Sequence, residues 1–180
     1  MFEEPMLKAS KSFYERERDH RLNLQNIPQY IDYVKLRRDE EQVIRPSAYL
    51  SAHPETVTRL IEDVVKKVLI EDCSKDIVDM KTTGLSHLLT NAATLSSSSP
   101  SIVRDLYDLF EWSGSESAME SLRKGLVNHV LSFGRDAGSG NISGIAFIDS
   151  LCKFYHDLEA IVTRDFKGNF LVDLEKVLFA

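Results

Sequence analysis

Apolar residues recur at helical spacing along most of the chain. Two stretches show the pattern most clearly. The first has apolar residues at Leu60, Ile61, Val64, Val65, Val68 and Leu69, and Thr56 is placed to cap its helix. The second has apolar residues at Met119, Leu122, Leu126, Val130 and Phe133. No convincing run of alternating apolar and polar residues lies between turn signals, as a half-buried strand would require. The pattern therefore predicts an all-α fold of about seven to eight helices.

Turn-forming residues predict where these helices end. Asn26-Ile27-Pro28 separates the first two helices, and Pro46 should kink or end the second, because proline is tolerated in the first turn of a helix but not in its interior. The serines and proline of 96–100 form the clearest loop. Gly134 is expected to end the helix that begins near Met119, and Lys167-Gly168-Asn169 separates the last two helices.

The last predicted helix is unusual because it is apolar on most sides. Residues 170–180 read FLVDLEKVLFA and end on Leu178, Phe179 and Ala180 without a polar cap. A helix that is apolar nearly all round is normally buried, so this segment should either fold back on the chain or be covered by something else. The candidate partner-contact residues are therefore Phe170, Leu174, Leu178 and Phe179.

Charge and cysteine content narrow the classes of function. The formal net charge is −6, from 22 Lys and Arg against 28 Asp and Glu, and it divides evenly along the chain. Neither half is basic enough to predict nucleic-acid or anionic-membrane binding. The acidic first residues do not match a signal peptide, and no apolar stretch reaches the ~18 residues of a membrane span. With only Cys73 and Cys152, we expect an intracellular protein of the cytoplasm or nucleus.

No catalytic, cofactor or metal site is predicted. Cys152 and His156 lie one helical turn apart, but no second pair completes a zinc site, and a core cysteine beside a surface histidine explains them better. A nucleophile that uses Cys152 stays open, because its partners need not be neighbours in sequence. The glycines between Gly138 and Gly144 lack the lysine and the preceding strand of a phosphate-binding loop.

A series of short motifs runs in order along nearly the whole chain. They are FYE at 13–15, IPQYI at 27–31, EE at 40–41, YL at 49–50, KVLIE at 67–71, IVDM at 77–80, GLSHLL at 84–89, RDLYDLF at 104–110 and FKGNF at 166–170. Each motif is weak alone, but their order is specific, and taken in this order they resemble the cullins, the scaffold subunits of RING-type ubiquitin ligases. IVDM and GLSHLL look most like the class that recruits BTB-domain adaptors. Pro46 and an expanded loop at 92–100 depart from the family pattern.

The resemblance implies a piece of the cullin N-terminal stalk. Residues 1–24 would be the last helix of one cullin repeat, and residues 25–180 a following repeat that is truncated at its C-terminus. The implied function is a non-catalytic rigid spacer that holds a substrate adaptor and a RING protein with its E2 at fixed separation. Both the BTB-type adaptor and the RING protein would bind outside this segment, so no functional residue is carried over. Cofactors, nucleic acid, membranes and small-molecule substrates are not expected.

A second interpretation is a stand-alone helical adaptor or vesicle-tethering module, since tethering complexes contain rods of similar helix pairs. The sequence leaves the adaptor class, the substrate and the oligomeric state open. It also does not decide whether the chain is naturally truncated, or whether Ser96, Ser97, Ser98 and Ser99 are modified.

Overall fold

The computed structural model describes residues 3–44, 54–94, 101–139 and 144–178, and every regular element in these residues is helical. The all-α prediction is confirmed. A π-helical turn, Glu40–Ile44, extends α2, and a 3₁₀ turn, Glu71–Cys73, follows α3. The α-helices are α1 (Glu3–Asn23), α2 (Ile27–Asp39), α3 (Pro54–Leu69), α4 (Ser74–Asp79), α5 (Leu85–Thr94), α6 (Ile102–Ser113), α7 (Glu116–Ser139), α8 (Gly144–Asp165) and α9 (Leu171–Leu178).

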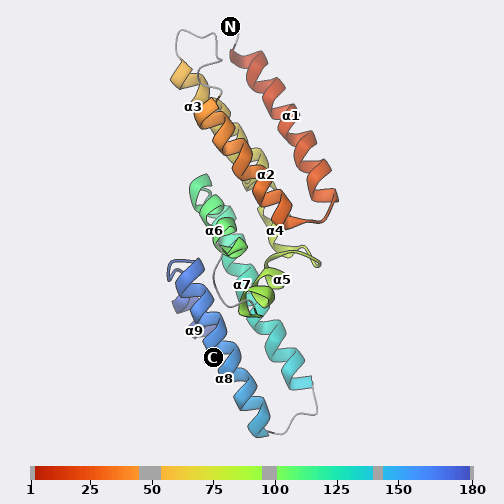
Figure 1. Cartoon of the computed structure of the whole chain (residues 1–180), viewed down its shortest axis with the longest axis vertical. Coiled ribbons are helices and arrows are strands. Elements are labelled where there is room, and N and C mark those ends of the chain that lie inside the picture. Colours follow the sequence, from red (N-terminus) through yellow and green to blue (C-terminus); the bar gives the residue numbers. More distant parts are fainter. Residues whose placement is uncertain (1–2, 45–53, 95–100, 140–143, 179–180) are drawn as a thin grey trace.

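The helices form an elongated molecule with two groups arranged along its long axis (Figure 1). In the N-terminal group, α1, α2 and α3 pack side by side. In the second group, α7 contacts α4, α5, α6, α8 and α9, so it is the central helix of that half. Contacts between α2 and α6 join the two groups. None of the described helices is both long and apolar enough to cross a membrane.

Local sequence signals explain several helix ends. The Asn26 side chain caps α2 by accepting a hydrogen bond from the Gln29 amide at 3.1 Å, and Pro28 lies in the first turn, where its missing N–H costs nothing. Ser101 caps α6 by accepting from the Val103 amide at 3.2 Å. Gly114 ends α6 in the left-handed conformation at φ 67°, which glycine adopts without strain.

Two helix boundaries differ from the sequence predictions. Helix α3 begins at Pro54 rather than after a Thr56 cap, because proline suits the first helical position. The prediction that Gly134 ends a helix is wrong, since α7 continues through it to Ser139. One glycine costs a helix only about 1 kcal/mol, which packing of the rest of α7 offsets. The predicted break at Pro46 and the loop at 96–100 lie outside the described residues.

The core is apolar and continuous through both groups of helices. The stripe predicted in α3 is buried at Ile61, Val65, Val68 and Leu69, and the stripe predicted in α7 is buried at Leu122, Leu126 and Val130. Aromatic side chains supply the largest buried volumes. Those less than 2% exposed are Tyr14, Tyr30, Tyr107, Phe110 and Phe166.

Candidate functional surface: a helix junction and an apolar groove

The two groups of helices meet at the one tryptophan of the sequence, Trp112 in α6. The Lys66 Nζ atom of α3 lies 5.0 Å from the centroid of the indole ring, and the Arg38 guanidinium of α2 lies 5.9 Å from it. Nearby, Lys35 Nζ of α2 is 3.0 Å from Asp105 Oδ1 of α6. Each partly exposed contact is individually weak. Together they fix the orientation of α6 against α2 and α3.

A buried hydrogen-bonded cluster holds the end of α3 against α2. The Tyr30 hydroxyl donates to the Leu69 carbonyl oxygen at 2.9 Å and lies 3.4 Å from the Cys73 sulfur. The Cys73 thiol also donates to the Leu69 carbonyl oxygen at 3.2 Å. Burial raises the pKa of the Cys73 thiol to about 11 and also raises the pKa of the Tyr30 hydroxyl. Cys73 is therefore a packed structural residue and not a reactive thiol.

Thr83 links the turn between α1 and α2 to the turn between α4 and α5. Its hydroxyl donates to the Gln25 carbonyl oxygen at 2.8 Å and accepts from the Ile27 amide at 3.2 Å. Gln25 has φ 51°, so the chain reverses sharply at this point. These two hydrogen bonds join residues that are 56 and 58 positions apart in the sequence, and so hold the two turns together.

The link between α8 and α9 is clamped onto α6. Lys167 Nζ lies 3.0 Å from Asp108 Oδ1 and 2.5 Å from Glu111 Oε2, which raises the pKa of Lys167. Asn169 donates from Nδ2 to the Tyr107 hydroxyl. The sequence places a helix break at 167–169, and the link takes left-handed φ angles at Lys167 and Gly168. These contacts hold α9 in place along the second group of helices.

The four predicted partner-contact residues have different positions. Phe170 is half-buried, and its ring packs edge-on against the rings of Phe166 and Tyr107, with centroids 5.8 and 6.5 Å apart. Leu174 is only 2% exposed, so this part of α9 folds back on the chain. Leu178 is the last residue of α9, and its side chain, like Phe179, lies outside the described residues. Contact of these residues with a partner stays a prediction.

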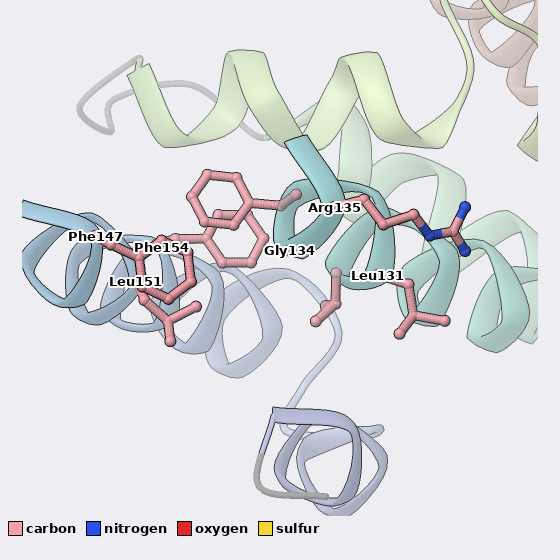
Figure 2. A pocket seen from close by; sticks show the side chains of 8 residues that line it. Leu131, Gly134, Arg135, Phe147, Leu151 and Phe154 are labelled. Carbon is pink, nitrogen blue, oxygen red and sulfur yellow. The ribbon is translucent and has the colours of Figure 1, made fainter. Parts of the chain in front are cut away.

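An open apolar groove of about 370 Å³ runs between α7 and α8. Figure 2 shows Phe147, Leu151 and Phe154 of α8 on one side, Gly134 in the middle, and Arg135 pointing away from the phenylalanines. Within the lining of the groove, the Phe133 and Phe154 rings stack with their centroids 3.8 Å apart and an angle of 3° between them. Near the start of α8, Ile145 is 78% exposed and Ile148 is 58% exposed. The groove exists only because α7 and α8 pair, so no local sequence pattern predicts it.

The other constellations weighed in the sequence do not form sites in the described part of the chain. Cys152 is exposed, so the interpretation of a core cysteine beside His156 is wrong. Its position in α8 turns it toward solvent, and His156 Nδ1 instead lies 3.9 Å from Glu159 Oε2. Among the described residues, no group of three or more His, Cys, Asp or Glu side chains could hold a metal ion. Gly138 continues α7, and residues 140–143 lie outside the description.

The chain matches the model of a known protein family. No curated protein matches the chain. The family model of the cullin alpha solenoid domain matches residues 1–178, which is nearly the full sequence, and the packed helices described above agree with it. The chain therefore belongs to the cullin family.

Proposed function

We propose that this chain is a rigid, non-catalytic spacer segment of a cullin-RING E3 ubiquitin ligase, holding a substrate adaptor and a RING-bound E2 at fixed separation. Membership of the cullin family supports a scaffold role. The observation that carries the proposal is the helix junction, where Trp112 and the Lys35–Asp105 ion pair connect two separately packed groups of helices. A spacer without such a connection would bend between the groups.

Rigidity matters for this function because transfer of a group between two tethered proteins depends on how often the reacting atoms meet. Holding reactants in a productive arrangement lowers the entropic cost of the reaction and can supply much of its rate. Helical solenoids suit this task because each helix pair fixes the orientation of the next. The described contacts among α2, α3, α6 and α7 form one such continuous path.

The partners follow from the same proposal. A BTB-type adaptor and a RING protein would bind outside this segment, and the protein would act in the cytoplasm or nucleus. The motifs at 77–80 and 84–89 support the BTB class. In the structure these motifs lie mostly in α4 and α5, and five of their apolar residues are buried in the core: Ile77, Val78, Leu85, Leu88 and Leu89.

Distance measurement between spin labels on the two halves tests the rigidity. Cys152 in α8 is exposed and accepts one label, whereas the buried Cys73, with its pKa raised to about 11, resists labelling. A second label is attached in α1 through Lys11→Cys, a position whose side chain is 52% exposed. We expect one narrow distribution of distances by double electron–electron resonance. A broad or multiple distribution in this otherwise unchanged chain would overturn the proposal.

Removal of the Trp112 side chain tests whether the junction is the source of the rigidity. Trp112→Ala should broaden the distance distribution, because it removes the surface that Lys66 and Arg38 cover. Leu131→Ala is the control, since Leu131 is an exposed apolar residue of α7 away from the junction. If the Trp112 variant kept a distribution as narrow as that of the Leu131 variant, the junction would not be the source of the rigidity.

A further inference from the structure

A second hollow lies beside the stacked rings of Phe133 and Phe154, where α5 crosses α7 and α8. It encloses about 200 Å³ and is separate from the groove of Figure 2, although the two phenylalanines line both. Leu89 and Ala93 of α5 form one wall, and Leu158 and Ile161 of α8 form another. We call this hollow the α5–α8 pocket.

The size and lining of the α5–α8 pocket suit an aromatic ring. Apolar cavities of about 150 Å³ in proteins bind benzene, so a pocket of about 200 Å³ has room for one or two fused rings. A flat ligand entering here would meet the edges or faces of Phe133 and Phe154, and aromatic pairs gain energy beyond the area they bury.

The polar groups of the pocket set the preferred charge of a ligand. Asp157 is the only charged residue among the described residues that line it. His129 also lines it, with Nδ1 hydrogen-bonded to Ser86 Oγ at 2.6 Å, and burial lowers the pKa of His129, which keeps the ring neutral at pH 7. Thr90 uses its hydroxyl to donate to the Ser86 carbonyl oxygen at 2.9 Å. The pocket thus carries a negative charge and no compensating positive one among these residues.

We propose that the α5–α8 pocket is a binding site for a small aromatic molecule of one or two rings that carries an N–H donor or an ammonium group. The ring would pack among Leu89, Phe133 and Phe154, and the donor would face the Asp157 carboxylate. Such a ligand contacts three helices at once and stabilises their packing, because it binds the folded chain and not the unfolded one. This site is independent of the spacer role.

Titration of the full chain with three related probes tests the site: indole, tryptamine and indole-3-acetate, followed by NMR chemical shifts. Dissociation constants on the order of 0.1 to 1 mM are expected for ligands of this size. Tryptamine should bind more tightly than indole, and indole more tightly than indole-3-acetate, because the Asp157 carboxylate attracts the ammonium group and repels the acetate. The shifts should concentrate on Leu89, Ala93 and Leu158. Failure of all three probes to saturate by about 10 mM would overturn the proposal.

Two substitutions with a matched control sharpen the result. Ala93→Leu fills the pocket from an exposed position of α5 and should weaken indole binding at least about tenfold. Ala160→Leu makes the same change at an exposed position of α8 outside the lining and should leave binding unchanged. Asp157→Asn should remove the advantage of tryptamine over indole. Equal binding by the two leucine variants, or shifts confined to the groove residues Val130 and Leu151, would contradict the assignment.

Discussion

At the scale of single residues, two glycines of α7 have opposite surroundings. A Cβ atom built at Gly134 meets nothing within 4 Å, whereas one built at Gly125 would overlap Val78 and lie 2.9 Å from Leu85 Cδ2. Both glycines lie inside a helix, where alanine is preferred. The difference between them is therefore one of packing and not of backbone conformation.

The two sites give a paired prediction. Gly134→Ala should stabilise the chain by about 0.5–1 kcal/mol, because it restricts the unfolded state and meets no obstacle. Gly125→Ala should destabilise it by about 1–3 kcal/mol, because α4 and α5 must move away from α7. Urea unfolding measures both changes. Equal effects of the two substitutions would show that α4 does not approach α7 as closely as described.

His129 predicts a pH dependence of stability. Burial lowers the pKa of this histidine below its usual value of about 6.5, so the unfolded state takes up a proton at a higher pH than the folded state does. The contribution of neutral His129 to the free energy of unfolding is therefore fully present above about pH 6.5 and is lost as the pH falls below that value. His129→Gln should flatten the dependence of the unfolding midpoint on pH below about 6.5.

The matched control for this prediction is His156→Gln. The His156 side chain is 76% exposed, so the substitution should leave the pH dependence as it is in the unchanged chain. If stability fell more steeply with decreasing pH in the His129→Gln variant than in the unchanged chain, the predicted role of His129 would be contradicted.

At the scale of helices, the apolar period predicted the long elements well. The stripes of α3 and α7 and the cap of α6 by Ser101 follow from local rules that tertiary contacts do not override. The sequence does not separate α4 from its neighbours, because its six residues are too few to show a period. The low helix propensity of Gly134 predicts a helix end there, because sequence alone does not show that packing offsets this cost.

The candidate surfaces were harder to predict, because they depend on which helices meet. Trp112 gave no signal in the sequence, since Lys66 and Arg38 come from two other helices. The apolar composition of α9 did predict burial, and Leu174 is buried, but nothing in the sequence shows that Tyr107 and Lys167 anchor its start. The exposed Cys152 shows the same difficulty, because a mostly apolar helix such as α8 still has one open side.

At the scale of the whole molecule, the junction predicts a single unfolding transition. Trp112 is the only tryptophan, so its fluorescence reports on the contact between the two groups of helices, whereas circular dichroism reports on all of them. If the groups are coupled, both signals should change at the same urea concentration.

Lys35→Ala, which breaks the ion pair with Asp105, should shift the midpoints of both signals together, and Lys75→Ala at an exposed position of α4 should shift neither. Fluorescence that changes before circular dichroism would show that the groups separate first.

The close approach at Gly125 has a further consequence for how the helices could slide. Sliding α4 along α7 by one turn is a move of about 5.4 Å, and it would bring Val78 against the side chain of Leu122 or His129 in place of the bare backbone of Gly125. A shift of α4 by one turn in either direction along α7 is therefore opposed by overlap of side chains. Because α4 cannot slide along α7, the second group of helices cannot become longer or shorter by a shift of these two helices. The contact at Gly125 therefore fixes the length of this group of helices as well as its shape.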